Sequence, residues 1–146
     1  MSSFTQEALD SFLSTFERNT TSSDPAVVIA QFAETFLAAG PAGSTLVPAA
    51  TFAQMLPSRR QYFEKAGLRA SQLIARHDMQ IGERYVLVDT QWKMDFAPTD
   101  KPEITLTVGS AFLIDMGSSD PKILAYLTHQ DIYQLIQEHN LSPQPS

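Results

Sequence analysis

Two long segments of the chain, residues 84–96 and 103–116, alternate apolar and polar side chains with almost no interruption. A period of two residues predicts β-strands that bury one face. Both segments are about twice the usual strand length of roughly 5–6 residues, so they are long enough to bend. We therefore predict a concave sheet. Its inner face should carry Val86, Val88, Thr90, Trp92, Met94 and Phe96 from the first segment and Ile104, Leu106, Val108, Ser110, Phe112, Ile114 and Met116 from the second.

Helical periodicity fills the N-terminal part of the chain. Residues 5–18 place Leu9, Phe12, Leu13 and Phe16 on one stripe. A second helix is expected to begin at residues 24–25, a good N-cap and a proline, and to end at residues 40–41. Its buried side would hold Val28, Ile29, Phe32, Ala33, Phe36 and Leu37. A third helical stretch, residues 48–66, should kink or restart at Pro57, because proline lacks a backbone donor.

Shorter elements complete the pattern. Residues 44–47 and 122–127 resemble strands, and residues 68–80 do so weakly, without indicating which side chains face inward. Residues 128–131 resemble a capping box before a final short helix with Ile132, Leu135 and Ile136 inward. We expect residues 1–4 and 141–146 to fray. Helices followed by a meander predict one α+β domain over residues 1–146, with three N-terminal helices packed on a strongly curved antiparallel sheet.

Composition narrows the possible functions. The chain has 146 residues, of which 43% are hydrophobic and 18% charged, as in one ordinary globular domain. It contains no cysteine, which excludes disulfides, thiolate zinc sites and cysteine nucleophiles. A net charge of −6 and a pI near 4.9 argue against nucleic acid as a partner. The three histidines lack metal-ligand spacing, so we expect no metal and no cofactor.

The sequence also lacks signals for a membrane. No apolar run approaches the roughly 20 residues of a membrane span. Residues 1–7 lack the basic and apolar regions of a signal peptide. We therefore expect no membrane insertion and a cytoplasmic protein.

The order of these elements resembles the nuclear transport factor 2-like (NTF2-like) superfamily, in its SnoaL-like branch of small bacterial proteins. The similar features are amphipathic helices over residues 9–16 and 28–36, a helical segment ending at residues 62–67, a long strand containing Gln91 and Trp92, a second over residues 107–114, and a closing strand within residues 122–131. The resemblance implies a cone in which helices and a curved sheet enclose a deep apolar pocket. Relatives with this fold are isomerases, dehydratases, hydrolases, cyclases, ligand binders or dimerisation modules, so the fold does not select a function.

The pattern predicts which residues line that pocket. The expected set is Phe12, Phe32, Phe36 and Tyr62 from the helices and Val88, Trp92, Ser110 and Phe112 from the sheet. Trp92 could stack on a flat ligand or simply fill the core. Ser110 needs a hydrogen-bond partner, which could be a ligand or Thr90. Arg59 lies three residues before Tyr62 and could hold an anionic group at the pocket mouth, although both side chains could also lie at the seam between helix and sheet.

Catalytic groups are harder to find. Tyr62 could donate to a developing oxyanion and Asp78 could act as a base. The parity of the long strands places Asp89, Asp95 and Asp115 on the outer face, away from the pocket. The sequence therefore favours a protein that binds a small apolar molecule. The alternatives are a cofactor-free isomerase, dehydratase or hydrolase acting on an apolar ring-bearing substrate, and a homodimeric interaction module with a vestigial pocket.

The outer face of the long strands is not purely polar. Tyr85, Leu87, Ala111 and Leu113 lie there, surrounded by threonines and charged residues. Apolar groups at the centre with polar groups around them are typical of an interface. We therefore expect a two-fold homodimer formed through this face.

Overall fold

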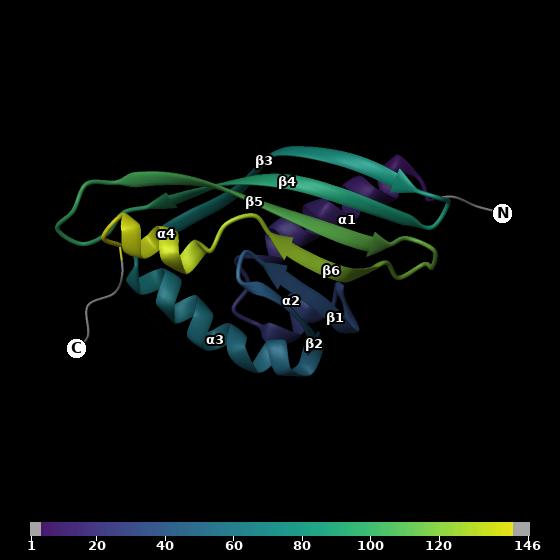
Figure 1. Ribbon diagram of the computed structural model, residues 1–146, viewed down its shortest axis with the longest axis horizontal. Coiled ribbons are helices and arrows are strands. Elements are labelled where there is room, and N and C mark those ends of the chain that lie inside the picture. The colour runs from purple at the N-terminus through teal and green to yellow at the C-terminus, as the bar shows by residue number, and fades with distance from the viewer. Residues whose placement is uncertain (1–3, 142–146) are drawn as a thin grey trace.

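A curved, unclosed six-stranded sheet organises residues 4–141, the part of the chain that this computed structural model describes (Figure 1). Its strand order is β2-β1-β6-β5-β4-β3. The strands are β1 (Phe32–Gly40), β2 (Gly43–Pro48), β3 (Leu68–Ile81), β4 (Tyr85–Phe96), β5 (Ile104–Asp115) and β6 (Lys122–Thr128). The helices are α1 (Gln6–Asn19), α2 (Pro25–Ile29), α3 (Ala49–Lys65) and α4 (Ile132–Glu138). The predicted α+β class is confirmed.

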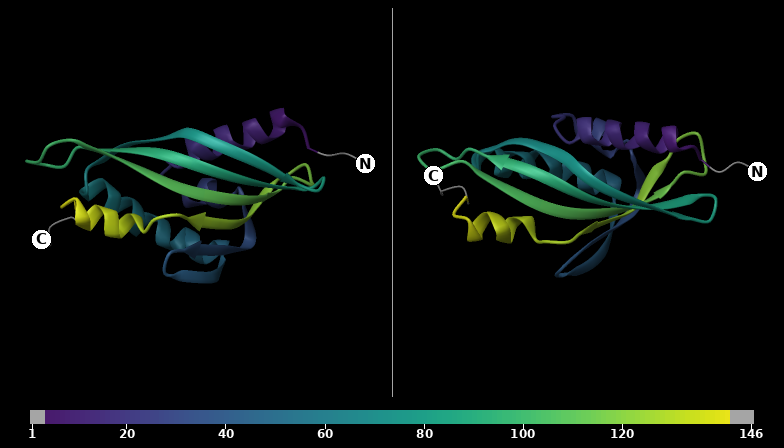
Figure 2. Two further views of the ribbon diagram at one scale, coloured as in Figure 1. Left: turned by 45° about the horizontal axis from the view of Figure 1, so that its top comes forward. Right: turned by 90° about the horizontal axis from the view of Figure 1, so that it is seen from above.

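The ladder between β4 and β5 is continuous over their full length. It pairs Tyr85 with Asp115 at one end and Phe96 with Ile104 at the other, with no register shift. The predicted inner parity is confirmed, since Val86, Val88 and Phe112 are all but inaccessible to solvent. By contrast, β3 pairs with β4 through two register shifts, near Leu68 and after Leu73. Such bulges bend and twist a strand, which fits the bowed sheet in Figure 2.

The concave face is filled by two hydrophobic clusters. In the first, Leu9, Phe12 and Leu13 of α1 pack against β4 and β5 near Val86 and Val88. In the second, Phe63 and Ala66 from the end of α3 pack with Met94, Phe96 and Ile136. The amphipathic stripe predicted for residues 5–18 therefore faces the sheet, as expected. Thr5 begins α1 by accepting a hydrogen bond from the Ala8 N–H at 3.0 Å.

The prediction of a long second helix was wrong. Helix α2 ends at Ile29, and residues 32–48 form a β-hairpin instead. Phe32 and Phe36 are four residues apart, a spacing that puts both on one face of a helix and equally on one face of a strand. Strand β1 pairs antiparallel with β2 and parallel with β6, so the sheet is mixed rather than wholly antiparallel. These non-local hydrogen bonds decide the conformation of a segment whose local pattern fits both.

Four further details differ from the predictions or narrow them. Of the two alternatives for Pro57, a kink or a restart, the restart does not occur, because α3 continues through this residue. Helix α4 is capped by Asp131, whose carboxylate accepts from the Tyr133 and Gln134 N–H groups, while residue 128 still belongs to β6. Leu141 does not fray, because its side chain is buried and its N–H donates to the Ile136 carbonyl at 2.9 Å. Phe4 likewise packs against the first cluster. The other residues expected to fray, 1–3 and 142–146, lie outside the described residues.

No helix within residues 4–141 is both long enough and apolar enough to cross a membrane.

The turn between α3 and β3 presses against the loop after β4. Gly67 has a φ of +96°, and its carbonyl accepts a hydrogen bond from the Ala97 N–H at 2.8 Å. A Cβ at residue 67 would lie only 2.7 Å from the Pro98 nitrogen. Glycine is therefore required both by the backbone conformation and by the close approach of another chain segment.

We expect Gly67→Ala to destabilise the protein more than Gly82→Ala. Both glycines have positive φ, which costs an alanine about 1–2 kcal/mol. A Cβ at Gly82 would meet nothing within 4 Å, whereas the one at Gly67 would strike backbone atoms. The loss of unfolding free energy should therefore be about 1 kcal/mol at Gly82 and about 2–3 kcal/mol at Gly67, measured by urea denaturation. Equal losses would contradict the close contact with Pro98.

Candidate functional site

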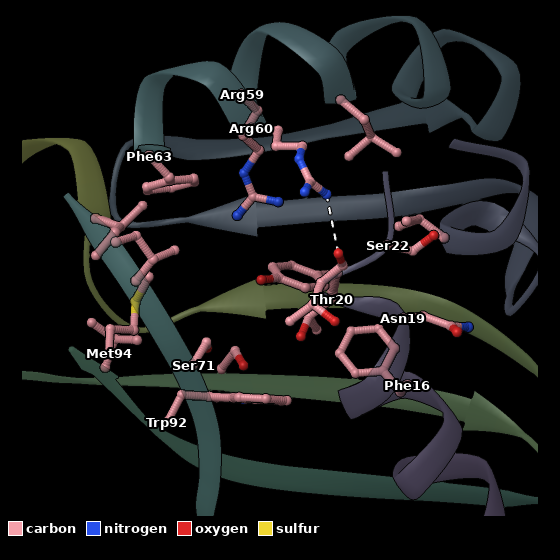
Figure 3. A pocket seen from close by; sticks show the side chains of 18 of the residues that line it. Phe16, Asn19, Thr20, Ser22, Arg59, Arg60, Phe63, Ser71, Trp92 and Met94 are labelled. Carbon is pink, nitrogen blue, oxygen red and sulfur yellow. Dashed lines mark hydrogen bonds between the residues drawn. The ribbon is translucent and has the colours of Figure 1, made fainter. Parts of the chain in front are cut away.

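A cavity of about 360 Å³ lies between the inner face of the sheet and α3 (Figure 3). The sheet forms its floor, α3 forms its roof, and residues 19–23 between α1 and α2 form part of its rim. The floor is made by Trp92, Met94, Val108, Ser110, Phe112 and Tyr126. The roof is made by Phe52, Leu56, Arg59 and Phe63, and Arg60 lies at the rim.

Aromatic rings join the helices to the floor. The Phe16 ring, near the end of α1, has its centroid 4.9 Å from that of Phe112 and 6.1 Å from that of Trp92, edge to face in both cases. The Phe32 ring of β1 lies 5.5 Å from the Phe52 ring of α3. Tilted and edge-to-face arrangements are the favourable ones for such rings. The cavity walls can therefore offer ring faces and edges to a flat apolar molecule.

A chain of three polar side chains crosses the floor. Trp92 Nε1–H donates to Thr90 Oγ1 at 2.9 Å, and Thr90 Oγ1 donates its proton to the Ser110 carbonyl at 2.7 Å. Thr90 Oγ1 also lies 2.9 Å from Ser110 Oγ. Because a hydroxyl has one proton, Ser110 must be the donor in that last bond. The Ser110 hydroxyl therefore keeps only acceptor lone pairs for the cavity, which suits an O–H or N–H group of a ligand.

Two neighbouring arginines extend from α3 toward the cavity (Figure 3). Arg60 is exposed and donates to Glu64 at 2.9 Å and to the Thr21 carbonyl at 3.1 Å, which ties α3 to the rim. Arg59 is half-buried, with its guanidinium carbon 5.2 Å from the centre of the Phe63 ring. The two arginines thus differ, since Arg60 belongs to the rim and Arg59 to the roof.

No protein-family model matches the sequence, and no curated protein matches it. Solved structures do match this architecture. An NTF2-like protein of unknown function from Shewanella oneidensis MR-1 superposes with a TM-score of 0.66 at 10% identity, over 85% of this chain and 98% of its own. A ketosteroid isomerase-like protein from Erwinia carotovora atroseptica SCRI1043 superposes with a TM-score of 0.66 at 12% identity, over 86% of this chain and 97% of its own. The benzoate 1,2-dioxygenase β subunit from Burkholderia mallei ATCC 23344 superposes with a TM-score of 0.69 at 12% identity, over 92% of this chain and 96% of its own.

The chain has the NTF2-like fold. At these identities the likeness establishes the fold and carries no activity to this chain. The SnoaL-like branch stays a prediction.

Half of the predicted pocket residues line the cavity of this NTF2-like fold. Phe32, Trp92, Ser110 and Phe112 do so. Trp92 also packs against Phe16, and its stacking on a ligand stays a prediction. Phe36 instead borders a neighbouring cavity of about 300 Å³, which shares four lining residues with the first: Phe52, Arg59, Tyr126 and Thr128.

The other three predicted lining residues lie elsewhere. Phe12 and Val88 are buried together in the first cluster, because α1 covers that half of the sheet directly. Tyr62 packs against Phe63 and Tyr133, with the two tyrosine ring centroids 5.1 Å apart. Its phenol therefore belongs to the contact between α3 and α4 rather than to the pocket mouth.

Part of the lining was missed by the sequence analysis. The rim residues 19–23 form a polar turn with no periodicity that could place them over the sheet. The roof was recoverable, since Phe52, Leu56, Arg59 and Phe63 follow a spacing of four, three and four residues. That spacing defines one face of a helix.

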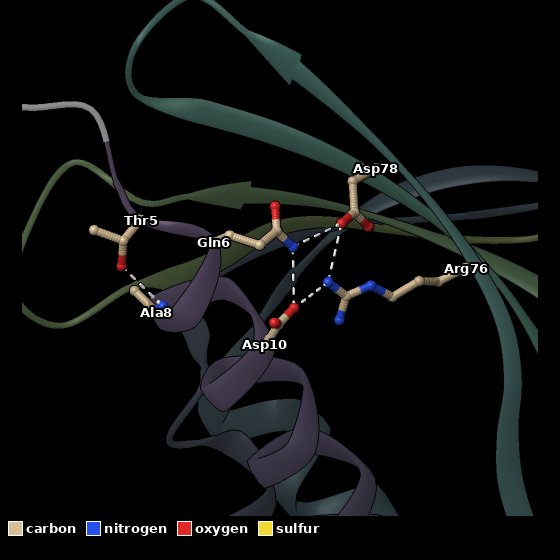
Figure 4. A network of polar contacts seen from close by, with 6 residues as sticks. All are labelled: Thr5, Gln6, Ala8, Asp10, Arg76 and Asp78. Carbon is tan, nitrogen blue, oxygen red and sulfur yellow. Dashed lines mark hydrogen bonds and ion pairs between the residues drawn. The ribbon is translucent and has the colours of Figure 1, made fainter.

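Asp78 lies in a separate polar network at the start of α1 (Figure 4). It accepts from Arg76 at 3.0 Å and from Gln6 Nε2 at 3.3 Å, and Arg76 also pairs with Asp10. The open question about residues 68–80 has two answers, because the register shift after Leu73 reverses the parity. Ser71 faces the cavity before the shift, whereas after it Arg76 and Asp78 face the helices and His77, which pairs with Asp89 in the ladder, faces outward. As a candidate base, Asp78 stands apart from the cavity floor.

The remaining titratable groups of the long strands lie on the outer face, as their parity predicts. His129 Nε2 lies 2.7 Å from Asp89 Oδ1, with both side chains about half exposed. Arg84 donates two hydrogen bonds to the Asp115 carboxylate, at 2.8 and 2.9 Å, and these bonds lower the pKa of Asp115. Within residues 4–141, no three His, Asp or Glu side chains gather as metal ligands would.

Asp10→Asn should make the free energy of unfolding less dependent on pH in the acidic range. Hydrogen bonds from Gln6 and then from Arg76 lower the pKa of Asp10 below 3.8. Its carboxylate therefore stabilises the fold above that unfolded-state value, and this contribution disappears as pH falls through the lowered folded-state pKa. Urea denaturation at several pH values should give the wild type a higher free energy of unfolding than the variant at neutral pH and an equal one in strong acid. Glu7→Gln, an exposed carboxylate in the same turn, is the control. A constant gap between wild type and Asp10→Asn at every pH would refute the network.

Proposed function

We propose that the protein binds a small, apolar, ring-bearing molecule in the cavity between the sheet and α3. The observation that carries this proposal is a cavity of about 360 Å³ whose walls are mostly apolar and include seven aromatic side chains. Ligand sites are typically of roughly 300–1,000 Å³, apolar, with a few fixed polar groups. The Trp92–Thr90–Ser110 chain supplies one such group on the floor. A ligand hydroxyl or amine that donates to Ser110 would be held in one orientation.

The arrangement gives less support to catalysis. Among the described residues that line the cavity, Glu64 is the single acidic one, and it is engaged with Arg60 at 2.9 Å. The proposed base Asp78 and the proposed donor Tyr62 lie in two other places. Acid–base chemistry needs both groups within hydrogen-bond reach of one substrate. A cofactor-free isomerase, dehydratase or hydrolase therefore stays the second candidate, favoured by structural neighbours described as ketosteroid isomerase-like and as a putative scytalone dehydratase.

Filling the cavity should abolish binding. Ser71 lines the cavity, while Gln72, the next residue, lies on the outer face opposite Lys93. Ser71→Phe should weaken binding of the probe 2-naphthol by at least about tenfold, because the new ring occupies the ligand's space. Gln72→Phe should bind it like wild type. Isothermal titration calorimetry measures both. Equal binding by Ser71→Phe and wild type would mean that the probe binds elsewhere.

The outer face of the sheet supports a homodimer. Ladder pairing aligns one apolar residue from every strand in a single row: Leu46, Leu37, Ala125, Leu113, Leu87 and Met79. At the two ends of the row, Leu46 is 69% exposed and Met79 is 52% exposed. A continuous apolar row of this kind would lose contact with water if a second copy packed sheet to sheet against it.

Leu113→Lys should convert the dimer to a monomer. A lysine at the centre of the row would place a charge in the apolar middle of the interface. Thr107→Lys, on the same face of β5 but outside the row, should leave the dimer intact. Sedimentation equilibrium at micromolar concentration distinguishes a mass of 16.1 kDa from twice that value. A wild-type protein at the monomer mass would rule out the dimer.

A further inference from the structure

The inward stripe of α3 carries a charge in its middle. Phe52, Leu56, Phe63 and Ala66 occupy positions of one helix face, and Arg59 stands between them. An arginine at such a position is half-buried among rings instead of being solvated on the outside. From this placement we propose that the ligand is an organic anion, a ring-bearing carboxylate whose carboxylate group binds Arg59. This inference rests on the proposed function and specifies its ligand class.

Three of the six arginines in the described residues form no ion pair with a carboxylate, namely Arg18, Arg59 and Arg69, and of these only Arg59 is half-buried. Arg60 pairs with Glu64, Arg76 with Asp10 and Asp78, and Arg84 with Asp115. Within residues 4–141, no carboxylate forms an ion pair with Arg59, and its one specific contact is the Phe63 ring at 5.2 Å. A partly desolvated guanidinium is costly unless an anion pairs with it. A bound carboxylate would supply that partner, with the planar geometry that matches the guanidinium fork.

The charge around the cavity is opposite to that of the whole protein. The chain has a net charge of −6, whereas the described lining residues include three arginines and one glutamate. Because Glu64 pairs with Arg60, the positive charges of Arg59 and Arg69 are left, and of these two side chains Arg59 is half-buried whereas Arg69 is exposed. An anionic ligand would therefore enter a cavity of opposite charge.

Both ends of such a ligand have a place. The carboxylate would lie under the roof at Arg59, and the ring would lie against the cavity sides of Phe16, Trp92 and Phe112. A hydroxyl or amino substituent on the ring would donate to Ser110 on the floor. The geometry thus fits a hydroxylated or amino-substituted ring acid.

The test compares 2-naphthoate with 2-naphthamide, a neutral molecule of nearly the same shape, by isothermal titration calorimetry. Wild type should bind the acid at least about tenfold more tightly than the amide, as expected for a charge-assisted bond. Arg59→Met should lose this preference while binding the amide as wild type does. Arg60→Met removes a neighbouring charge of the same kind and should keep the preference. Arg59→Lys should keep part of it, because the charge remains and the fork is lost.

Each other outcome has a definite meaning. If wild type binds acid and amide equally, or binds only 2-naphthol, the carboxylate assignment is wrong and the proposed function stands. If none of the three compounds binds, the proposed function fails and the assignment with it. If Arg60→Met loses the preference and Arg59→Met keeps it, the carboxylate binds at the rim and the role of Arg59 is refuted.

Thermal melting without ligand separates a binding role from a structural one. If Arg59 is kept for a ligand, Arg59→Met should melt at the same temperature as wild type or higher, because methionine suits the apolar stripe. If Arg59 mainly stabilises the fold by stacking on Phe63, the variant should melt at a lower temperature. It should also lose affinity for 2-naphthoate and for 2-naphthamide by the same factor. That second result would overturn the assignment.

Discussion

The uninterrupted ladder between β4 and β5 is the constraint on which the rest of the structure depends. Twelve residue pairs share one register, so every inward side chain of one strand faces an inward side chain of the other. A slip of β5 by one residue would turn Phe112 and Ser110 to the outer face while Trp92 of β4 stayed on the inner one. The same register brings Thr90 opposite Ser110, which makes the polar chain on the cavity floor possible. It also aligns Leu87 with Leu113 on the opposite face. One pairing therefore determines both surfaces that we connect with function.

The sequence predicted these strands well because one face of each is buried along its whole length. Under that condition the alternation from Val86 to Phe96 is enforced at every second position, and it is visible without any tertiary information. Residues 32–40 show where this reasoning ends. Phe32 and Phe36 satisfy helix and strand periodicity alike, and the choice is made by hydrogen bonds to β6, which is distant in sequence. Local pattern cannot contain that information.

The site was less predictable than the fold, for a related reason. Parity tells which face of a strand is buried, but not what covers it. Val88 and Trp92 share a parity, yet α1 packs directly over Val88, while Trp92 borders the cavity. The difference depends on where helices cross the sheet, which in turn depends on turns such as Gly67 against Pro98. The rim residues 19–23 carry no periodic signal, so only their position in space associates them with the floor.

The cavity persists because the roof is held at a distance from a floor that includes small residues. Ser71 and Ser110 face it where larger apolar side chains would fill it, while the rings of Phe16, Phe52 and Phe63 surround it. The roof is held by the Gly67 turn at one end of α3 and by the hydrogen bond that Arg60 donates to the Thr21 carbonyl at the rim. Interiors of proteins are otherwise close-packed, and unfilled space costs stability. A half-buried arginine in the roof adds to that cost. The unfilled cavity and the half-buried arginine lie in one place, as is expected of a binding site rather than of a packing defect.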